Sequence, residues 1–506
     1  MSLTIEDMAV FCKKKGFVYP NSEIYGGLAG FFDFGPLGVE LKNNIKNNWW
    51  KYNVQNRPDI VGIDGSIIAN RKIWQASGHE NNFVDLILTC SKCSNKLRAD
   101  HLIEEELKIT TDDLNPEDIK KLIKEKNLKC PKCKSQFEDP KSFNLMFATN
   151  IGSVENEDSL AYLRPETAQL IFSNFKNVVD TSRLKLPFGI AQIGKAFRNE
   201  ISPRSFLFRC REFEQMEIEF FVHPKKLNTC TCIKEVYDYK VSIYSAEMQK
   251  KKQKEKVMTI KEALDKKIIK TGWLAYWLAK QHRWLTYLSI DEKNLRLRQH
   301  GKEELAHYSS DCWDLEYKFP FGWEEVQGIA DRSNFDLEQH QKHSKKDLSI
   351  FDEESKEKII PYVAAEPSFG LERVFLVFMF EAYSDDKKRG NVVLRLDPQL
   401  APVKVGIFPL VKNKENVLSK AEEVYEMLRK NLICNLDISG SVGRRYARAD
   451  EQGTPYCCTI DFESVENNDV TIRNRDDTKQ VRVKIDDLKE ILEKLIKKDI
   501  AFKDLK

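Results

Sequence analysis

The chain has 506 residues, of which 41% are hydrophobic and 31% charged, which predicts a large core and two or three domains. No stretch reaches the ~18 apolar residues of a membrane-spanning helix, and the opening MSLTIEDMAVFCKKKGF does not resemble a signal peptide, so we expect a cytoplasmic protein with no membrane partner. The net charge of +3 argues neither for nor against an RNA partner, because a nearly neutral protein can carry basic patches.

The N-terminal segment contains a glycine-rich stretch followed by a helix. Residues 25–38 read YGGLAGFFDFGPLG and lack the lysine and the spacing of a P-loop, so we expect a tight loop. A helix is predicted from about Val39 to Tyr52, and Pro58 precedes a strand. An amphipathic helix of this kind most often packs on the sheet of its own chain.

Two cysteine pairs are the strongest metal-binding signal. Cys90 and Cys93 form one CxxC pair, and Cys130 and Cys133 form the other. Four thiolates at this spacing suit tetrahedral Zn²⁺ and leave no open position, so the zinc would be structural. Four free buried cysteines are the competing interpretation. Arg98 follows the first pair, and a salt bridge within the knuckle is its simplest role.

Residues 163–169 (LRPETAQ) predict the start of a helix, with proline and an acid in its first turn. On this basis Glu166 could be no more than a helix-start acid.

The stretch from Phe197 to Phe221, FRNEISPRSFLFRCREFEQMEIEFF, predicts the second half of a long antiparallel hairpin whose first strand is Phe188 to Phe197. Period-two alternation directs Met216, Ile218 and Phe220 to a core and leaves Gln215, Glu217 and Glu219 on an accessible face. Four arginines lie in and around the loop that contains Pro203: Arg198, Arg204, Arg209 and Arg211. Arginines bind phosphate and acids bind ammonium groups, so we expect a polyphosphate site beside an amine site. The alternative is an ordinary surface hairpin.

The segment from Pro224 to about Arg298 carries a lysine run at residues 249–256. A solvated helix face explains such a run better than a track for nucleic-acid phosphates. We expect Trp273, Trp277 and Trp284 to pack within this segment.

Two further stretches carry charged residues beside apolar runs. Residues 319–337 read FPFGWEEVQGIADRSNFDL and include Glu324 and Glu325. Residues 362–373 read YVAAEPSFGLER and predict a strand that ends at Glu366-Pro367, a turn from Ser368 and then a buried helix. Arg373 in the first turns of that helix opposes the helix dipole, which indicates an anion nearby. A salt bridge with Glu366 or Glu372 is the alternative.

After residues 400–402 the pattern restarts as alternating strands and helices, which predicts a small α/β domain. Expected elements are strands 403–411, 436–438 and 456–462, a helix 421–432, a glycine loop 440–443, and a hairpin of residues 470–472 with 481–485. Arg444, Arg445 and Arg448 suit unpaired RNA bases, on which guanidinium groups can stack. Their alternative role is pairing with Asp450 and Glu451.

FRNE, REFEQMEIEFF and EPSFGLER together resemble motifs 2 and 3 of the class II aminoacyl-tRNA synthetases, and nearly the whole chain is similar to the homodimeric glycyl enzymes. The resemblance implies an α+β catalytic domain built on an antiparallel sheet over residues 1–400. That domain would carry a zinc-knuckle insertion at about 88–142 and a helical insertion at about 224–300. Residues 401–506 resemble the anticodon-binding domain of the glycyl, threonyl, prolyl and histidyl enzymes. The unit around residues 39–58 resembles motif 1, which implies a homodimer.

The resemblance also implies site residues. Arg198 would bind the α-phosphate and act with Arg373 in catalysis, an aromatic such as Phe213 would stack on adenine, and Glu325 would place ATP and its Mg²⁺. Many relatives have glycine where this chain has Glu324, which leaves Glu325 in place. The glycine site would comprise Arg98, Glu166, Phe213, Glu214, Gln215, Met216, Glu217, Glu366, Pro367, Ser368, Phe369 and Gly370. The ATP site would comprise Arg198, Asn199, Glu200, Phe208, Arg209, Cys210, Arg211, Glu212, Phe213, Glu325, Val326, Gly370, Leu371, Glu372 and Arg373. Arg444, Arg445 and Arg448 would bind tRNA.

The activity implied is ATP-dependent attachment of glycine to tRNA(Gly) through a glycyl-adenylate. Arg198, Arg373 and Mg²⁺ would offset the negative charge of the transition state, without a covalent bond to the protein. A small pocket can reject larger amino acids by steric exclusion. One alternative is a class II synthetase for another small amino acid. The other is an inactive RNA-binding accessory protein, against which the presence of both arginines weighs.

Overall fold

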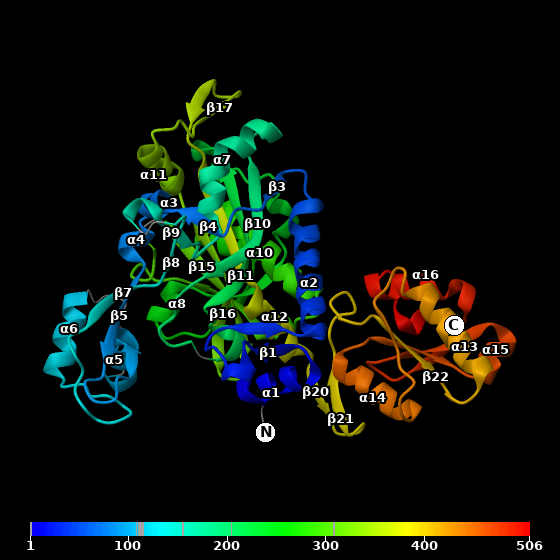
Figure 1. The fold of residues 1–506 in the computed structure, drawn as a ribbon. Helices are drawn as coiled ribbons and strands as arrows, with labels where there is room; N and C mark the ends of the chain where they lie inside the picture. The colour runs from blue at the N-terminus through cyan, green and yellow to red at the C-terminus, as the bar shows by residue number, and fades with distance from the viewer. Residues whose placement is uncertain are drawn as a thin grey trace.

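A nine-stranded sheet forms the centre of the computed structural model, which describes residues 3–107, 109, 116–153, 156–203, 205–306 and 309–505 (Figure 1). The strand order is β13-β12-β14-β15-β16-β19-β11-β10-β3, and within this sheet only β10–β3 and β12–β14 pair in parallel. The bounds are β3 Ile60–Ile63, β10 Phe188–Phe197, β11 Glu212–Val222, β12 Lys240–Tyr244, β13 Lys256–Thr259, β14 Leu295–Gln299, β15 Asp311–Phe319, β16 Gly322–Asp331 and β19 Tyr362–Gly370. The expectation of an antiparallel-based sheet is confirmed.

The hairpin at the middle of the sheet has the predicted form. β10 and β11 pair along their full lengths, with Gln192 opposite Glu217. Arg204, in the connecting loop, lies outside the described residues.

The prediction that the third motif turns after Pro367 is wrong. β19 lies between β16 and β11 and continues to Gly370, and α12 (Leu371–Ala382) begins at the next residue. The ladder with β11 has no partners for Glu366 and Pro367, but pairing with β16 carries the strand through this gap. Proline is tolerated because the neighbouring strand does not require its missing donor.

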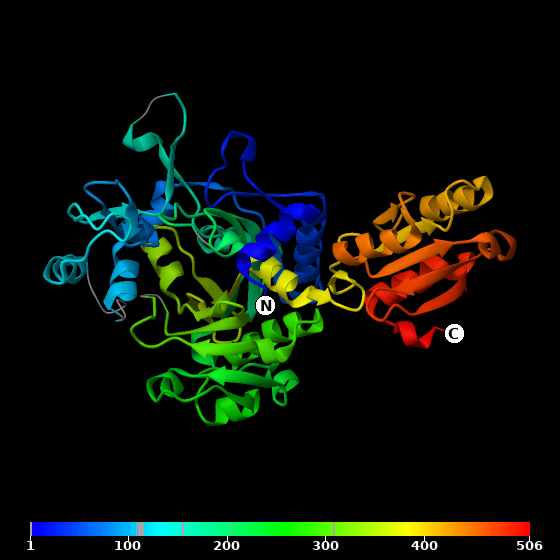
Figure 2. The same ribbon diagram turned by 90° about the horizontal axis from the view of Figure 1, so that it is seen from below.

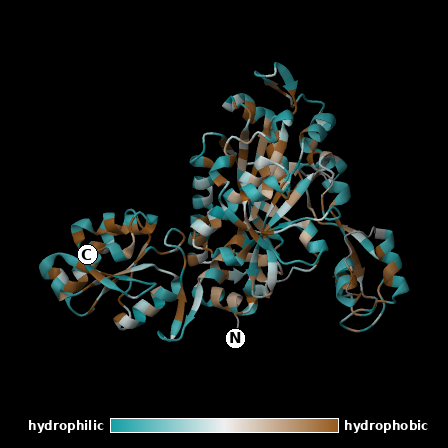
Figure 3. Cartoon of the chain, turned by 180° about the vertical axis from the view of Figure 1, so that it is seen from behind, coloured by the Kyte–Doolittle hydropathy of each residue, from teal (hydrophilic) through white to brown (hydrophobic). Residues whose placement is uncertain are grey.

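Helices cover both faces of the sheet. Met216, Ile218 and Phe220 of β11 belong to a core shared with α2 (Pro36–Trp50), α10 (Gly272–Tyr287) and α12. On the other face, α7 (Ala168–Ser182) packs through Phe172 and Phe175 against Phe221. Figure 3 shows hydrophobic residues concentrated between these layers. No helix in the described ranges is long and apolar enough to cross a membrane.

Residues 224–300 do not form the separate helical insertion that we expected. The segment supplies β12, β13 and β14 to the central sheet. Trp273 and Trp277 pack on Phe220 of β11, and Trp284 packs on Phe369 of β19. β12 and β14 do alternate apolar and polar residues, but each has only five residues, and strands this short give a weak signal beside the longer helical pattern of the segment. The segment also contains α8 (Ala246–Lys250) and α9 (Ile260–Asp265).

Two smaller units lie on opposite sides of the central body in both Figure 1 and Figure 2. One contains β5 (Val84–Thr89), β6 (Lys96–Arg98), β7 (Lys141–Asn144), α5 (Ala99–Leu107) and α6 (Pro116–Glu125) and has its own small core. The other is the C-terminal sheet, ordered β23-β22-β24-β25-β26. Its bounds are β22 Val405–Pro409, β23 Cys434–Leu436, β24 Tyr456–Ile460, β25 Asp469–Asn474, β26 Gln480–Lys484, α13 Glu415–Leu428, α14 Val442–Gln452, α15 Phe462–Asn467 and α16 Ile485–Lys497.

The remaining elements are short and surround the body. They are α1 Ile5–Lys15, β1 Val18–Pro20, β2 Phe32–Phe34, β4 Ile68–Asn70, α3 Arg71–Ala76, α4 His79–Asn82, β8 Phe147–Asn150, β9 Leu160–Leu163, α11 Phe335–Ser344, β17 Ile350–Asp352, β18 Glu357–Ile359, β20 Tyr383–Asp386 and β21 Asn391–Leu394. Ion pairs connect the body to the C-terminal sheet: Arg389 contacts Asp450 at 3.1 Å, and Lys15 contacts Glu451.

Candidate active site

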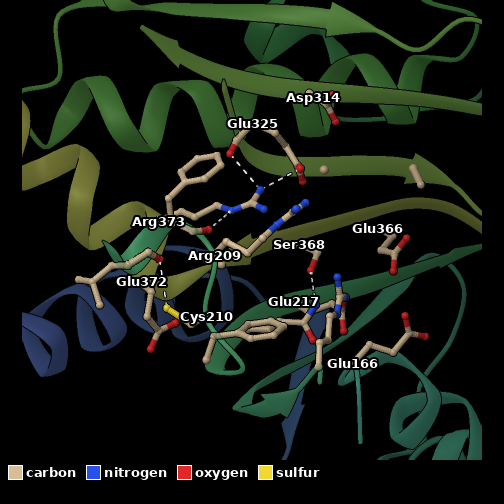
Figure 4. A pocket seen from close by; sticks show the side chains of 18 of the residues that line it. Glu166, Arg209, Cys210, Glu217, Asp314, Glu325, Glu366, Ser368, Glu372 and Arg373 are labelled. Atoms are coloured by element: carbon tan, nitrogen blue, oxygen red, sulfur yellow. Dashed lines mark hydrogen bonds and ion pairs between the residues drawn. The ribbon is translucent and has the colours of Figure 1, made fainter. Parts of the chain in front are cut away.

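A cavity of about 320 Å³ opens over β11, β16 and β19, the strands that carry the motif residues (Figure 4). It is lined by Glu166, Arg198, Glu200, Leu207, Phe208, Arg209, Cys210, Phe213, Gln215, Glu217, His300, Cys312, Asp314, Glu325, Gly328, Ala330, Glu366, Ser368, Gly370, Glu372 and Arg373. Most of the residues expected from the sequence therefore meet in one place.

Strand alternation decides which motif residues reach the cavity. Gln215 and Glu217 line it from β11, and Ser368 and Gly370 line it from β19. Because successive side chains of a strand point to opposite faces, the residues between them face away. Predicted site residues that do not line the cavity are Arg98, Asn199, Arg211, Glu212, Glu214, Met216, Val326, Pro367, Phe369 and Leu371.

Several of these excluded residues have structural partners. Glu214 pairs with Lys42 at 2.8 Å and Lys46 at 3.2 Å on the opposite face of the sheet. Arg98 pairs with Asp85 at 3.0 Å and Asp100 at 2.5 Å, which confirms the salt bridge expected within the knuckle. Glu372 borders the cavity, but its carboxylate is held by Lys42 at 2.9 Å and by the backbone N–H of Glu214 at 2.8 Å.

The two motif arginines line the same cavity, and each lies over an aromatic ring. The Arg198 guanidinium is 5.3 Å from the ring centre of Phe213, and its Nε donates to the Pro165 carbonyl at 3.1 Å. The Arg373 guanidinium is 4.5 Å from the ring centre of Phe208. Stacking on these rings restricts the orientation of both guanidinium groups.

Arg373 pairs with Glu325, at 2.8 Å between Nη1 and Oε2, and its Nε donates to the Phe208 carbonyl at 3.2 Å. The predicted alternative, a salt bridge from Arg373 to Glu366 or Glu372, is wrong, because Glu366 pairs with Arg332 and Glu372 with Lys42. Glu325 lies far from Arg373 in the chain, and the two meet because β16 pairs with β19, the strand that runs directly into α12. Sequence proximity therefore does not identify the partner.

The other end of the cavity is acidic. Glu217 was expected to be accessible, but its side chain is only 1% exposed. Its carboxylate still borders the cavity, and it accepts a hydrogen bond from the Thr167 hydroxyl. Glu366 pairs with the buried Arg332, at 2.5 Å between Oε1 and Nη1. Arg332 also contacts Asp336 at 2.8 Å. The cavity thus brings two stacked arginines and a group of carboxylates together.

Burial raises the pKa of each of these acids, and neighbouring charges then shift the three pKa values apart. Burial raises the pKa of Glu366 to about 8; Arg332 opposes the rise, and the charges of Glu217 and Glu166 add to it. Burial and the Glu166 charge also raise the pKa of Glu217. For Glu166 burial acts in the same sense, but His79 and Arg332 outweigh it and hold its pKa below the usual range.

Glu166 lies just before a helix rather than inside it, because α7 begins at Ala168. Its carboxylate is 3.4 Å from His79 Nε2 and accepts a hydrogen bond from Gln169 at 3.0 Å. The sequence analysis assigned no role to His79 or Arg332, and no motif marks either residue as part of an acidic site.

One further group of residues that line the cavity was not predicted from the sequence. It contains His300, Cys312 and Asp314, with His300 Nε2 at 2.8 Å from Asp314 Oδ2. Burial opposes a charged imidazole, but hydrogen bonds to Asp314 and Cys312 outweigh it and raise the pKa of His300 to about 11. The spacing of Cys312 and Asp314 on one strand is a signal that could have drawn attention to this wall.

The four cysteines of the CxxC pairs come together as their spacing predicts. Their sulfur atoms all lie within 4.8 Å of one another, with Cys90 and Cys133 sulfurs 3.3 Å apart and Cys93 and Cys130 sulfurs 3.7 Å apart. A hydrogen bond from the Ser135 backbone, with further bonds from Ser135 and Cys90, lowers the pKa of Cys133 to about 6. Four convergent sulfurs, one of them readily ionised, fit tetrahedral Zn²⁺.

The arginines expected to bind RNA differ in accessibility. Arg445 is buried and donates to the Pro409 carbonyl at 2.6 Å, so an RNA-facing role is wrong for its side chain. Arg448 pairs with Asp437 at 2.5 Å, whereas Arg444 is exposed. The alternative partners were also wrong, because Asp450 pairs with Arg473 and Glu451 with Lys15.

Comparison with known proteins defines the class. Residues 147–379 match the model of the tRNA synthetase class II core domain (G, H, P, S and T), and residues 404–495 match the anticodon binding domain. With the motif arginines in one cavity over an antiparallel sheet, these matches make the chain a class II aminoacyl-tRNA synthetase by domain content.

Relatives over nearly the full length narrow the class to one family. The glycine–tRNA ligase of Ruminiclostridium cellulolyticum is 47% identical over 96% of this chain and 97% of its own. Those of Clostridium kluyveri and Geobacillus thermodenitrificans are each 45% identical, over 97% and 98% of this chain and over 98% of their own. The chain belongs to the glycine–tRNA ligase family.

Proposed function

We propose that this chain catalyses the ATP-dependent attachment of glycine to tRNA(Gly) through a glycyl-adenylate. The observation that carries the proposal is the single cavity that holds Arg198, Arg373 and the acids Glu166 and Glu217. A nucleotide needs cations for its phosphates, and an amino acid needs acids for its ammonium group. The family membership of the chain supports the same reaction.

In the proposed first step, the glycine carboxylate attacks the α-phosphorus of ATP and pyrophosphate leaves. Arg198 binds the α-phosphate, and the transition state is stabilised by the positive charge of Arg198 and Arg373. We propose that adenine stacks on Phe213, where Arg198 lies in the free protein, and that Arg373, now over Phe208, moves onto the opposite face of the base. No side chain forms a covalent bond with the substrate.

Magnesium enters with ATP, and Glu325 is the residue that we propose to hold it. Carboxylate oxygen is the donor that Mg²⁺ prefers, and Glu325 borders the cavity next to Arg373. Bound Mg²⁺ neutralises phosphate charge. Glu325 would then exchange part of its contact with Arg373 for the metal.

The amino acid is proposed to bind at the acidic end. Glu217 and Glu166 accept the ammonium group, and Ser368, opposite Glu217 in the ladder, contributes a hydroxyl. Gln215 Oε1 accepts from the Thr167 backbone at 3.1 Å, which fixes the wall beside these acids. A side chain larger than hydrogen would meet this wall, so steric exclusion can select glycine.

The finer features of the family are further parts of the proposal. Cys90, Cys93, Cys130 and Cys133 would hold a structural Zn²⁺ that keeps the 88–142 unit folded. The anticodon-binding domain, taken as 401–506, would contact tRNA, with Arg444 and Arg448 as its accessible cations. We further propose that the protein is cytoplasmic. We also propose a homodimer, because the apolar side chains of Ile24, Tyr25 and Leu28 near the motif 1 unit are 87%, 86% and 53% exposed.

Pyrophosphate exchange with ATP tests the activation step. Exchange that depends on glycine and not on alanine, serine or proline supports the proposal, and charging of tRNA(Gly) transcript tests the transfer step. Exchange with another of these amino acids favours a different class II synthetase. Exchange with none favours an inactive accessory protein and overturns the proposal.

A further inference from the structure

A second cluster of metal-binding side chains lies in the cavity, apart from the four cysteines. Cys312 and Asp314 are two residues apart on β15, so they share one face of the strand. His300 directly follows β14, and its backbone N–H donates to the Cys312 carbonyl at 2.9 Å. The three side chains therefore stand side by side on neighbouring strands, and their donor atoms all lie within 4.8 Å of one another.

We propose that His300, Cys312 and Asp314 form a binding site for Zn²⁺ inside the cavity. An imidazole nitrogen, a thiolate and a carboxylate are the donors that zinc takes in sites with three protein ligands. A tetrahedral zinc places its donors roughly 3.3–3.8 Å apart, given bond lengths of about 2.0–2.3 Å. The three donor atoms, all within 4.8 Å of one another, already lie near that spacing.

The thiol separates this site from the Mg²⁺ that accompanies ATP. Magnesium takes oxygen donors, whereas sulfur and imidazole favour zinc and its neighbours among the transition metals. The cluster would therefore select zinc even when magnesium is abundant.

The local charges accommodate a divalent cation. Once the Cys312 thiol gives up its proton to the incoming metal, its thiolate and the Asp314 carboxylate supply two negative charges, and Glu325 of β16 lines the same cavity (Figure 4). Arg298 approaches Asp314 at 3.4 Å, but it also pairs with Glu304 at 2.5 Å, which offsets its charge. Zinc takes the place of the proton that His300 shares with Asp314, so binding releases protons.

Three protein ligands leave the fourth zinc position open, as in zinc sites that bind an exogenous ligand. That position faces the cavity, so it can take water or a phosphate oxygen. The inference stands apart from the proposed function, because metal binding is measured without any substrate.

Cobalt titration of the full chain tests the site. The full chain is treated with a chelator until metal analysis finds only the zinc of the CxxC cysteines, and it is then titrated with Co²⁺ and followed by absorbance. We expect one additional equivalent of Co²⁺ and a thiolate-to-cobalt charge-transfer band from a single sulfur. In Cys312→Ser the band disappears and the affinity for cobalt falls at least about tenfold.

A matched control and a second variant complete the design. Cys434→Ser removes a half-buried thiol of the C-terminal sheet, outside both clusters, and should leave the titration unchanged. Asp314→Asn keeps the side-chain shape, removes one ligand charge and should weaken cobalt binding even if Cys312→Ser does not fold. A wild-type chain that takes no additional cobalt overturns the site, and so does a band that persists in Cys312→Ser.

Discussion

Arg198 and Arg373 line one cavity, and each guanidinium lies over a phenylalanine ring, Phe213 for the first and Phe208 for the second. They come from different motifs on different elements. They share this cavity with the carboxylates of Glu166 and Glu217. The predictions below follow from this arrangement.

Replacing Arg373 by alanine should reduce pyrophosphate exchange by about 10²- to 10³-fold or more, because a fixed cation at the reacting phosphate is lost. The fold should survive, since Arg373 contacts Glu325 and Phe208 at the cavity rather than in the core. Exchange kinetics and thermal unfolding measure the two effects. Arg429→Ala, at the exposed residue that follows α13, serves as the control. Near-normal exchange in Arg373→Ala would refute the assigned role.

Glu217→Gln should raise the KM for glycine and leave the KM for ATP almost unchanged. Removing the charge that faces a buried ammonium group costs about 2–5 kcal/mol, which corresponds to a rise of roughly 30-fold or more. Steady-state exchange at varied glycine and ATP separates the two constants. Glu212→Gln changes an acid on the same strand that pairs with Lys195 outside the cavity, and it should behave like the wild type. Equal effects in both variants contradict an ammonium site at Glu217.

Glycine binding should release a proton near neutral pH. Burial raises the pKa of Glu366 to about 8 in the free protein, so this acid is mostly protonated at pH 7. An ammonium group nearby favours the ionised form and lowers that pKa, so a proton leaves on binding and affinity rises as the pH increases toward 8. Calorimetry in buffers of different ionisation enthalpy counts the protons. Glu366→Gln should abolish the release, and an unchanged proton count in this variant speaks against Glu366 as its source.

Protein purified without added metal should contain one zinc per chain at the four cysteines of the CxxC pairs, counted separately from any zinc at His300, Cys312 and Asp314. Cys133→Ser should lose it and should make residues 88–142 sensitive to protease, because the small core of this unit depends on the metal. Metal analysis and limited proteolysis measure these effects, with Cys434→Ser as the matched control. A wild-type chain without zinc overturns the knuckle interpretation.

The elements with strong local signals were predictable from sequence. The β10–β11 hairpin, the buried helix after Gly370 and the convergence of two CxxC pairs all follow from alternation, turn residues and ligand spacing. The polar residues of β11 were assigned to the correct face, although Glu217 is buried there by Thr167 and β19. Pattern shows direction on a strand but not what another element places over it.

Features that depend on distant contacts were not predictable. Arg332 pairs with Glu366 because it directly follows β16, which pairs with the strand β19 that carries Glu366. The tryptophans of α10 pack on β11 and β19 rather than within their own segment. The sequence suggested that Arg445 contacts RNA, but its side chain on α14 is buried and donates a hydrogen bond to the Pro409 carbonyl. In each case the partner lies far away in the chain, so no local pattern identifies it.

A crystal structure with glycyl-sulfamoyl-adenosine, a stable mimic of the adenylate, tests the central claim most directly. The account predicts the analogue in the cavity described above, with its ammonium group against Glu217 and Glu166, its sulfamoyl group at Arg198 and its adenine between Phe213 and Arg373. An analogue bound elsewhere, or lying in the cavity with its ammonium group away from both acids, would contradict the account.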